Sequence, residues 1–192
     1  MKRVFSCGAV ALLLLVAAAD ASAQGKLSGF AAIGPTTTTG DLKDADSTKS
    51  GFMVQGGFEY KLTAPLWLRV DASMGWNDRI TNFAEDAYIW TFAGRAEYWL
   101  PMGTDKLRPY VLGGAGIMLY KRNPGQTGLE DTPEFETKNR VLVSGGAGLD
   151  WQIGGTSIFL EGRYDMGLKK DNETGSARAF IPIIVGARWG AR

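Results

Sequence analysis

The chain contains no histidine, and its one cysteine, Cys7, lies near the N-terminus. Most hydrolases and acyl transferases use a histidine as acid or base, so this absence removes the Ser-His and His-base arrangements on which they depend. A single cysteine has no partner for a disulfide and forms no cysteine cluster for a metal. The absences favour a protein that is not an enzyme, with no catalytic residues, no metal site and no cofactor.

An excess of one charge is missing as well, because 21 lysines and arginines stand against 20 aspartates and glutamates. Without residues 1–23 the totals fall by two and by one, to 19 each. A balanced charge gives no electrostatic footprint for nucleic acid, so we expect no such partner. Beyond residue 23 the chain also lacks the roughly 20 consecutive apolar residues of a membrane-spanning helix.

The first 23 residues have the pattern of a cleavable signal peptide. Lys2 and Arg3 precede an apolar run over residues 9–19, and Ala21-Ser22-Ala23 supplies small residues for cleavage. An uncleaved helical anchor is the alternative, although the run is short for a membrane span. Cys7 precedes the apolar run, unlike a lipoprotein acylation site, and would leave with the signal. We predict a signal peptide over 1–23 and one exported domain over 24–192.

Eight stretches of the remaining chain alternate apolar and polar residues, the period of a β-strand with two different faces. In one stretch Leu68 and Val70 share a face, while Arg69 and Asp71 lie on the other. A strand of about 10 tilted residues crosses the apolar band of an outer membrane, about 25 Å tall. The predicted strands cover residues 26–34, 51–61, 66–77, 87–100, 109–120, 140–152, 157–168 and 179–189.

The connections between these strands alternate between long and short. The long polar ones cover 35–50, 78–86, 121–139 and 169–178, and the short ones cover 62–65, 101–108 and 153–156. Membrane barrels place long loops outside the cell and short turns in the periplasm. The pattern predicts an all-β fold: an eight-stranded antiparallel up-and-down transmembrane β-barrel with extracellular loops and periplasmic termini.

Aromatic residues gather near both ends of the predicted strands, where their rings would anchor the barrel at the lipid headgroups. On the outward face we place Trp76, Tyr88, Trp90 and Tyr120 toward the loops, and Phe58, Tyr60, Tyr98, Tyr110, Trp151 and Trp189 toward the turns. The alternative is that these rings fill the core of a soluble sandwich. That alternative would have to explain why the opposite faces carry so many charges.

Those opposite faces carry charges that a small barrel has to bury. Eight strands enclose little more than their own side chains, so buried charges must pair. Folding the strands on one another sets Glu59 beside Arg69, Arg69 beside Glu97, and Asp71 beside Arg95. We predict a salt-bridged plug, with a gated water path or an ion site as the alternatives. Its members are Glu59, Arg69, Asp71, Arg95, Glu97, Glu161, Arg163 and Asp165.

Four cationic residues follow strands on the predicted outer side, where they could contact phosphate groups of outer-leaflet lipid. They are Lys121, Arg122, Lys169 and Lys170. Outer membrane lipids are therefore expected partners, and the variable loops could bind an extracellular ligand.

The whole exported chain resembles the small outer-membrane β-barrel superfamily, which includes the membrane domain of outer membrane protein A and the opacity-type surface proteins. Residues 180–189, within the predicted last strand, fit the family's closing strand. Gly186 and Trp189 fit the signal that the insertion machinery reads, whereas Ala191 and Arg192 replace the usual terminal phenylalanine. The resemblance implies a structural or surface-interaction role with a largely closed interior. The alternatives are a narrow pore or small-solute carrier, and a soluble barrel holding an apolar ligand.

Overall fold

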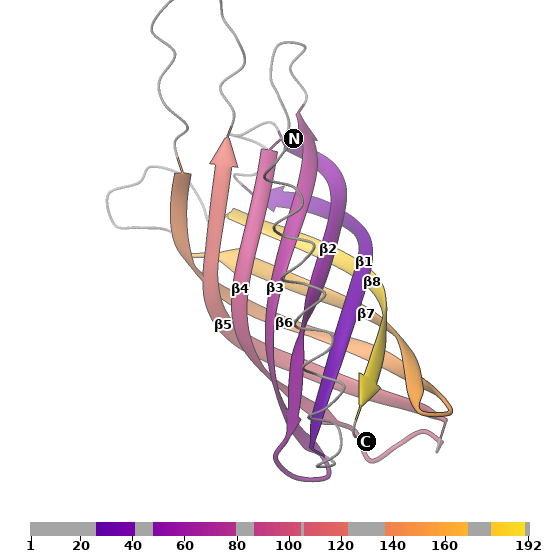
Figure 1. Cartoon of the computed structure of the whole chain (residues 1–192). Helices are drawn as coiled ribbons and strands as arrows, with labels where there is room; N and C mark the ends of the chain where they lie inside the picture. The colour runs from indigo at the N-terminus through magenta and orange to yellow at the C-terminus, as the bar shows by residue number, and fades with distance from the viewer. Residues whose placement is uncertain are drawn as a thin grey trace, which may run out of the picture.

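Eight antiparallel strands form a closed barrel in the computed structural model, which describes residues 26–40, 48–79, 87–104, 106–122, 137–168 and 178–190. Each strand pairs with its neighbours in sequence, and β1 closes the barrel against β8 (Figure 1). This confirms the predicted fold class. The strands are β1 (Leu27–Gly40), β2 (Thr48–Lys61), β3 (Leu66–Arg79), β4 (Ala87–Trp99), β5 (Leu107–Arg122), β6 (Thr137–Ile153), β7 (Thr156–Gly167) and β8 (Arg178–Gly190).

Strand β1 is longer than predicted, because it continues through Pro35 and four threonines to Gly40. The predicted loop over residues 35–50 is therefore wrong for 35–40 and 48–50, which belong to β1 and β2. Threonine is β-branched and suits a strand, and Thr36 and Thr38 are buried inside the barrel. Pro35 lies on the exposed face of a strand that continues past it.

The connections also alternate less strictly than predicted. Residues 80–86, between β3 and β4, and residues 100–106, between β4 and β5, are seven each. The shortest connection is the two-residue turn between β6 and β7, where Gly154 has a φ of 62°. A two-residue hairpin turn favours glycine because it needs a positive φ.

The two faces of the wall differ as the alternation predicts. Within the strands, every outward side chain that the structure describes is uncharged, and most are apolar. Tyr60, Tyr98, Trp90 and Trp151 are exposed on this face, as expected for the two aromatic belts. The inward face carries the charged residues, so the wall is apolar outside and charged inside.

Two aromatic assignments are wrong. Tyr110 and Tyr120 were placed on the outward face, but they point into the barrel and are 1% and 2% exposed. In β5 the inward parity falls on the even-numbered residues, so Val111 and Ile117 face outward instead. Gly148 on β6 makes room for Tyr110, because a Cβ there would lie 2.3 Å from the ring carbon Cζ.

Over the described residues, no helix is long and apolar enough to cross a membrane.

Candidate functional site: the charged barrel interior

The eight residues of the predicted plug all point into the barrel. They come from β2, β3, β4 and β7, and strand alternation places them on the inward face. Each is between 0% and 4% exposed. Burying a charge is costly unless it is paired and hydrogen-bonded, so their contacts decide whether this interior is stable.

Arg69 on β3 is the centre of the lower, turn-side part of the network. Its guanidinium pairs with Glu59 at 2.9 Å, with Glu161 at 2.8 Å, and with Glu97. The same group stacks on the ring of Phe30, 4.5 Å from its centroid. Three carboxylates from three different strands therefore share one guanidinium.

Arg163 on β7 joins this part to an upper, loop-side part. It pairs with Glu161 at 2.7 Å and with Asp165 at 3.1 Å, and it donates a hydrogen bond to Oε1 of Gln55 at 2.7 Å. Because Glu161 also binds Arg69, the ion pairs are continuous from one part to the other.

Arg95 on β4 organises the upper part. It pairs with Asp71, lies 3.6 Å from Asp165, and donates to the Ser144 hydroxyl at 3.0 Å. Ser144 in turn donates to Asp165 at 2.5 Å. The structure thus brings together the three pairs named from the sequence: Glu59 with Arg69, Arg69 with Glu97, and Asp71 with Arg95.

Arg188 on β8 was missing from the predicted site. It pairs with Glu59 at 3.0 Å, with Glu97 at 3.3 Å and with Asp150 at 3.0 Å. A signal for it was present, because Ile183, Val185 and Ala187 are one face of β8 and Arg188 falls on the other. A charge on the inward parity of the closing strand identifies it as part of the interior.

Hydroxyl groups complete the lower part of the network. Tyr110 donates a hydrogen bond to Glu161 at 2.7 Å, and Ser157 donates to Asp150 at 2.5 Å. The mistaken outward assignment of Tyr110 concealed the first of these contacts. Hydrogen bonds of this kind satisfy lone pairs that the guanidinium groups leave open.

Several carboxylates and arginines share the ion pairs of the interior. The described ion pairs use six acids and four fully buried arginines, with Arg108 as a fifth arginine at the turn end. Arg108 is 34% exposed and lies 3.7 Å from Asp150. In the ranges that the structure describes, no group of three or more His, Cys, Asp or Glu is placed to hold a metal ion.

Two apolar clusters flank this ion-pair network, one on its loop side and one on its turn side. On the loop side, inward residues from five strands form one buried cluster: Met53, Ile89, Ala93, Met118, Tyr120, Leu142 and Phe180. We call this cluster the apolar septum. At the turn side, Trp67, Trp99, Tyr110 and Leu112 form a second cluster. The inward charges alone did not predict either cluster, because apolar residues on the inward parity are interspersed with them.

The predicted headgroup contacts stay predictions. Lys121 and Arg122 belong to the end of β5, where their backbones pair with Tyr88 and Ala87. Nothing is described of their side chains, and Lys169 and Lys170 lie outside the described residues.

The sequence matches a family model described as the outer membrane protein beta-barrel domain over residues 9–132. A comparison with curated proteins finds no match.

Several solved structures share the fold. Neisserial surface protein A (NspA) is 14% identical with a TM-score of 0.66, over 85% of this chain and 96% of that one. The N-terminal barrel of Pseudomonas aeruginosa OprF is 16% identical with a TM-score of 0.49, over 85% and 98%. The outer membrane enzyme PagL is 17% identical with a TM-score of 0.43, over 85% and 99%. At such identities the likeness concerns the fold alone.

Proposed function

The chain belongs to the outer membrane protein beta-barrel domain family, and from this premise we propose that it is a closed barrel that presents its loops for contacts outside the cell. It resides in the outer membrane, with outer membrane lipids around its wall. In this proposal the interior holds the wall together and conducts nothing. The loops face the medium, and the turns and both termini face the periplasm.

One observation carries the proposal: the interior is filled in consecutive layers. The charge network is buried, and the septum residues Met53, Ile89, Met118, Leu142 and Phe180 are at most 1% exposed. An eight-stranded barrel is wide enough only for its own side chains. Water or an ion would have to displace both the septum and several ion pairs to pass, so we infer that the resting barrel is closed.

Catalysis is not part of this proposal. The chain has no histidine, and the carboxylates that could act as a pair, Glu161 and Asp165, are each bound to arginines. A barrel fold hosts many functions, so these side chains, and not the barrel, bear on catalysis.

Conductance tests the closed interior. Refolded protein, with folding shown by heat-sensitive migration on a detergent gel, should give no unitary current steps in a planar bilayer. Reproducible steps from folded protein would replace this proposal with the narrow pore, and would make the inward arginines candidates for its ion selectivity.

Thiol labelling gives a second test that needs no channel. A chain beginning at residue 24 has no cysteine, so single cysteines report accessibility. Ser73→Cys lies at a buried inward position, and Thr104→Cys lies in the exposed β4–β5 turn. A small water-soluble reagent should label the turn variant in the folded barrel and the inward variant only after heating. Equal labelling would show water inside.

Export and insertion follow the same proposal. We infer that residues 1–23 are removed and that 24–192 form the barrel domain. The mass of the protein isolated from the outer membrane fraction would test this cleavage. We also infer that the insertion machinery reads the C-terminal strand through Gly186 and Trp189. If the loops bind an extracellular ligand, substitutions in the loops should reduce its binding, and the ligand should leave the conductance unchanged.

A further inference from the structure

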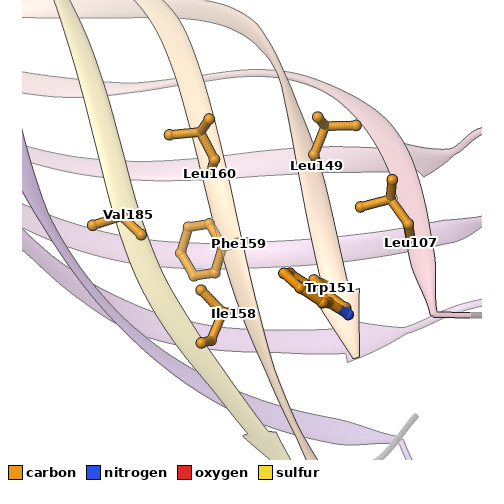
Figure 2. Close-up of a pocket in the computed structure, with 7 residues that line it drawn as sticks. All are labelled: Leu107, Leu149, Trp151, Ile158, Phe159, Leu160 and Val185. Carbon is orange, nitrogen blue, oxygen red and sulfur yellow. The ribbon is translucent and has the colours of Figure 1, made fainter. Parts of the chain in front are cut away.

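An apolar groove lies on the outward face of the wall, near the turn end of β5 to β8. Its volume is about 150 Å³, several times the share of one water molecule in the liquid, about 30 Å³. Figure 2 shows its lining, in which the side chains come from adjacent strands and no charge is present. The outward residues around it are Leu107, Leu149, Trp151, Ile158, Leu160 and Val185.

Strand pairing makes the groove a continuous feature. Leu107 pairs with Trp151, Trp151 with Ile158, Leu149 with Leu160, and Leu160 with Val185. The groove is part of the wall that faces lipid, so its natural neighbours are hydrocarbon chains. An acyl chain gains no hydrophobic free energy when it moves from the surrounding lipid into the groove. A preference for one lipid therefore has to come from the fit of its chain to the groove and from the polar groups at the rim.

The turn end of the groove carries a positively charged residue and a hydrogen-bond donor, both of which suit an anion. Lys106 is exposed immediately before Leu107, and its carbonyl accepts the N–H of Gln152 at 2.7 Å, beside Trp151. In Figure 2 the indole nitrogen of Trp151 lies toward the end of its strand, on the same side as this rim.

Other cations at this end point elsewhere. Lys61 lies over the inward Trp67 ring at 5.6 Å, and Arg108 lies over Trp99 at 4.7 Å. All six carboxylates whose side chains the structure describes are buried inside the barrel. Lys26, before β1, is also exposed at the turn end, but among the described residues Lys106 is the exposed lysine next in sequence to a residue of the groove, Leu107.

We propose that this groove binds one acyl chain of an anionic phospholipid from the turn-side leaflet, with the lipid phosphate held by Lys106 and the indole N–H of Trp151. In this proposal the chain occupies the apolar groove, and the headgroup lies at the turn end, where the backbone of Lys106 adjoins Gln152, the residue after Trp151. A lysine near a lipid surface favours an anionic headgroup about fivefold. The site depends on the outer membrane location and not on whether the interior is closed.

Native mass spectrometry of barrels refolded in mixed phosphatidylglycerol and phosphatidylcholine vesicles tests the site. The wild type should retain one phospholipid on gentle extraction, enriched about fivefold in the anionic lipid. Lys106→Gln should remove the enrichment, and Lys26→Gln, an exposed lysine before β1, should keep it. Loss of enrichment in both variants would show a diffuse charge effect and overturn the assignment.

A second pair of variants tests the groove itself. Val185→Phe and Ile158→Phe fill it and should abolish the retained lipid, whereas Val70→Phe, on the outward face of β3, should retain it. Heat-sensitive gel migration shows that each variant is folded. Retained lipid in both groove-filling variants, or no retained lipid in the wild type, would overturn the proposal whatever the conductance result.

Discussion

The inner and outer faces of this barrel are made by the same strands, yet different interactions stabilise them. Along β3, Arg69 is fully buried and pairs with three carboxylates, while its neighbour Val70 is 67% exposed on the outward face. The inner residue requires particular partners at particular distances. The outer residue requires only that its surroundings be apolar.

This difference predicts how each face tolerates change. An inner substitution leaves other charges buried without compensation, so its cost depends on a network. An outer substitution destabilises the barrel by the free energy of placing a polar group in hydrocarbon, and that free energy depends on the depth of the residue in the bilayer. A substitution of one apolar residue by another on the outward face should therefore change the stability little. An equally small substitution on the inward face can lower the stability much more.

The largest effect is expected at Arg69. Arg69→Met keeps an unbranched side chain but leaves Glu59, Glu97 and Glu161 buried without this guanidinium, and should lower the free energy of unfolding by about 3 to 5 kcal/mol. Denaturant titration in detergent or vesicles measures it. Arg108→Met is the control, because its ion pair is longer and partly exposed, and it should cost about 1 kcal/mol or less.

A double-mutant cycle sharpens this prediction. Adding Glu97→Gln to Arg69→Met removes one stranded charge and should restore part of the lost stability, with a coupling of about 0.5 to 3 kcal/mol. Strictly additive effects would show that the two groups do not interact, and the plug would lose its support.

The second largest effect is expected one residue away, at Val70. Val70→Arg places a charge in the lipid and should cost about 2 to 4 kcal/mol if the position lies near the bilayer midplane. Urea titration of folding into vesicles measures the loss, with Val70→Leu as the neutral comparison. Normal folding of the arginine variant would reverse the assignment of the two faces.

A smaller effect should separate two adjacent glycines of β6. A Cβ at the inward Gly146 would lie 2.4 Å from the carbonyl oxygen of Gly162, whereas a Cβ at the outward Gly145 meets nothing nearer than 4.0 Å. Gly146→Ala should destabilise by about 1 to 3 kcal/mol. Gly145→Ala should be neutral or stabilise by up to about 1 kcal/mol, because glycine is unfavourable within a strand. Melting temperatures compare the two directly, and equal losses would contradict the prediction.

Much of the site could be read from alternation, and the exceptions have identifiable causes. Parity placed Arg69, Arg95 and Arg163 inside because each lies between apolar neighbours along its strand. Tyr110 was misplaced because an amphipathic ring suits both a headgroup belt and a buried hydrogen bond. Only its neighbours Gly148 and Glu161 distinguish the two settings.

The sequence by itself determined the number of strands, their two faces and the presence of charges inside, because alternation and turn residues are local properties. Only the tertiary structure decided that Arg188 of the last strand meets Glu59 and Glu97, and that an apolar septum closes the loop side. Those contacts depend on how β8 closes on β1 and on which inward side chains share a level of the barrel. Closure joins the first and last strands, which are far apart in the chain, and no local pattern encodes which inward side chains then meet.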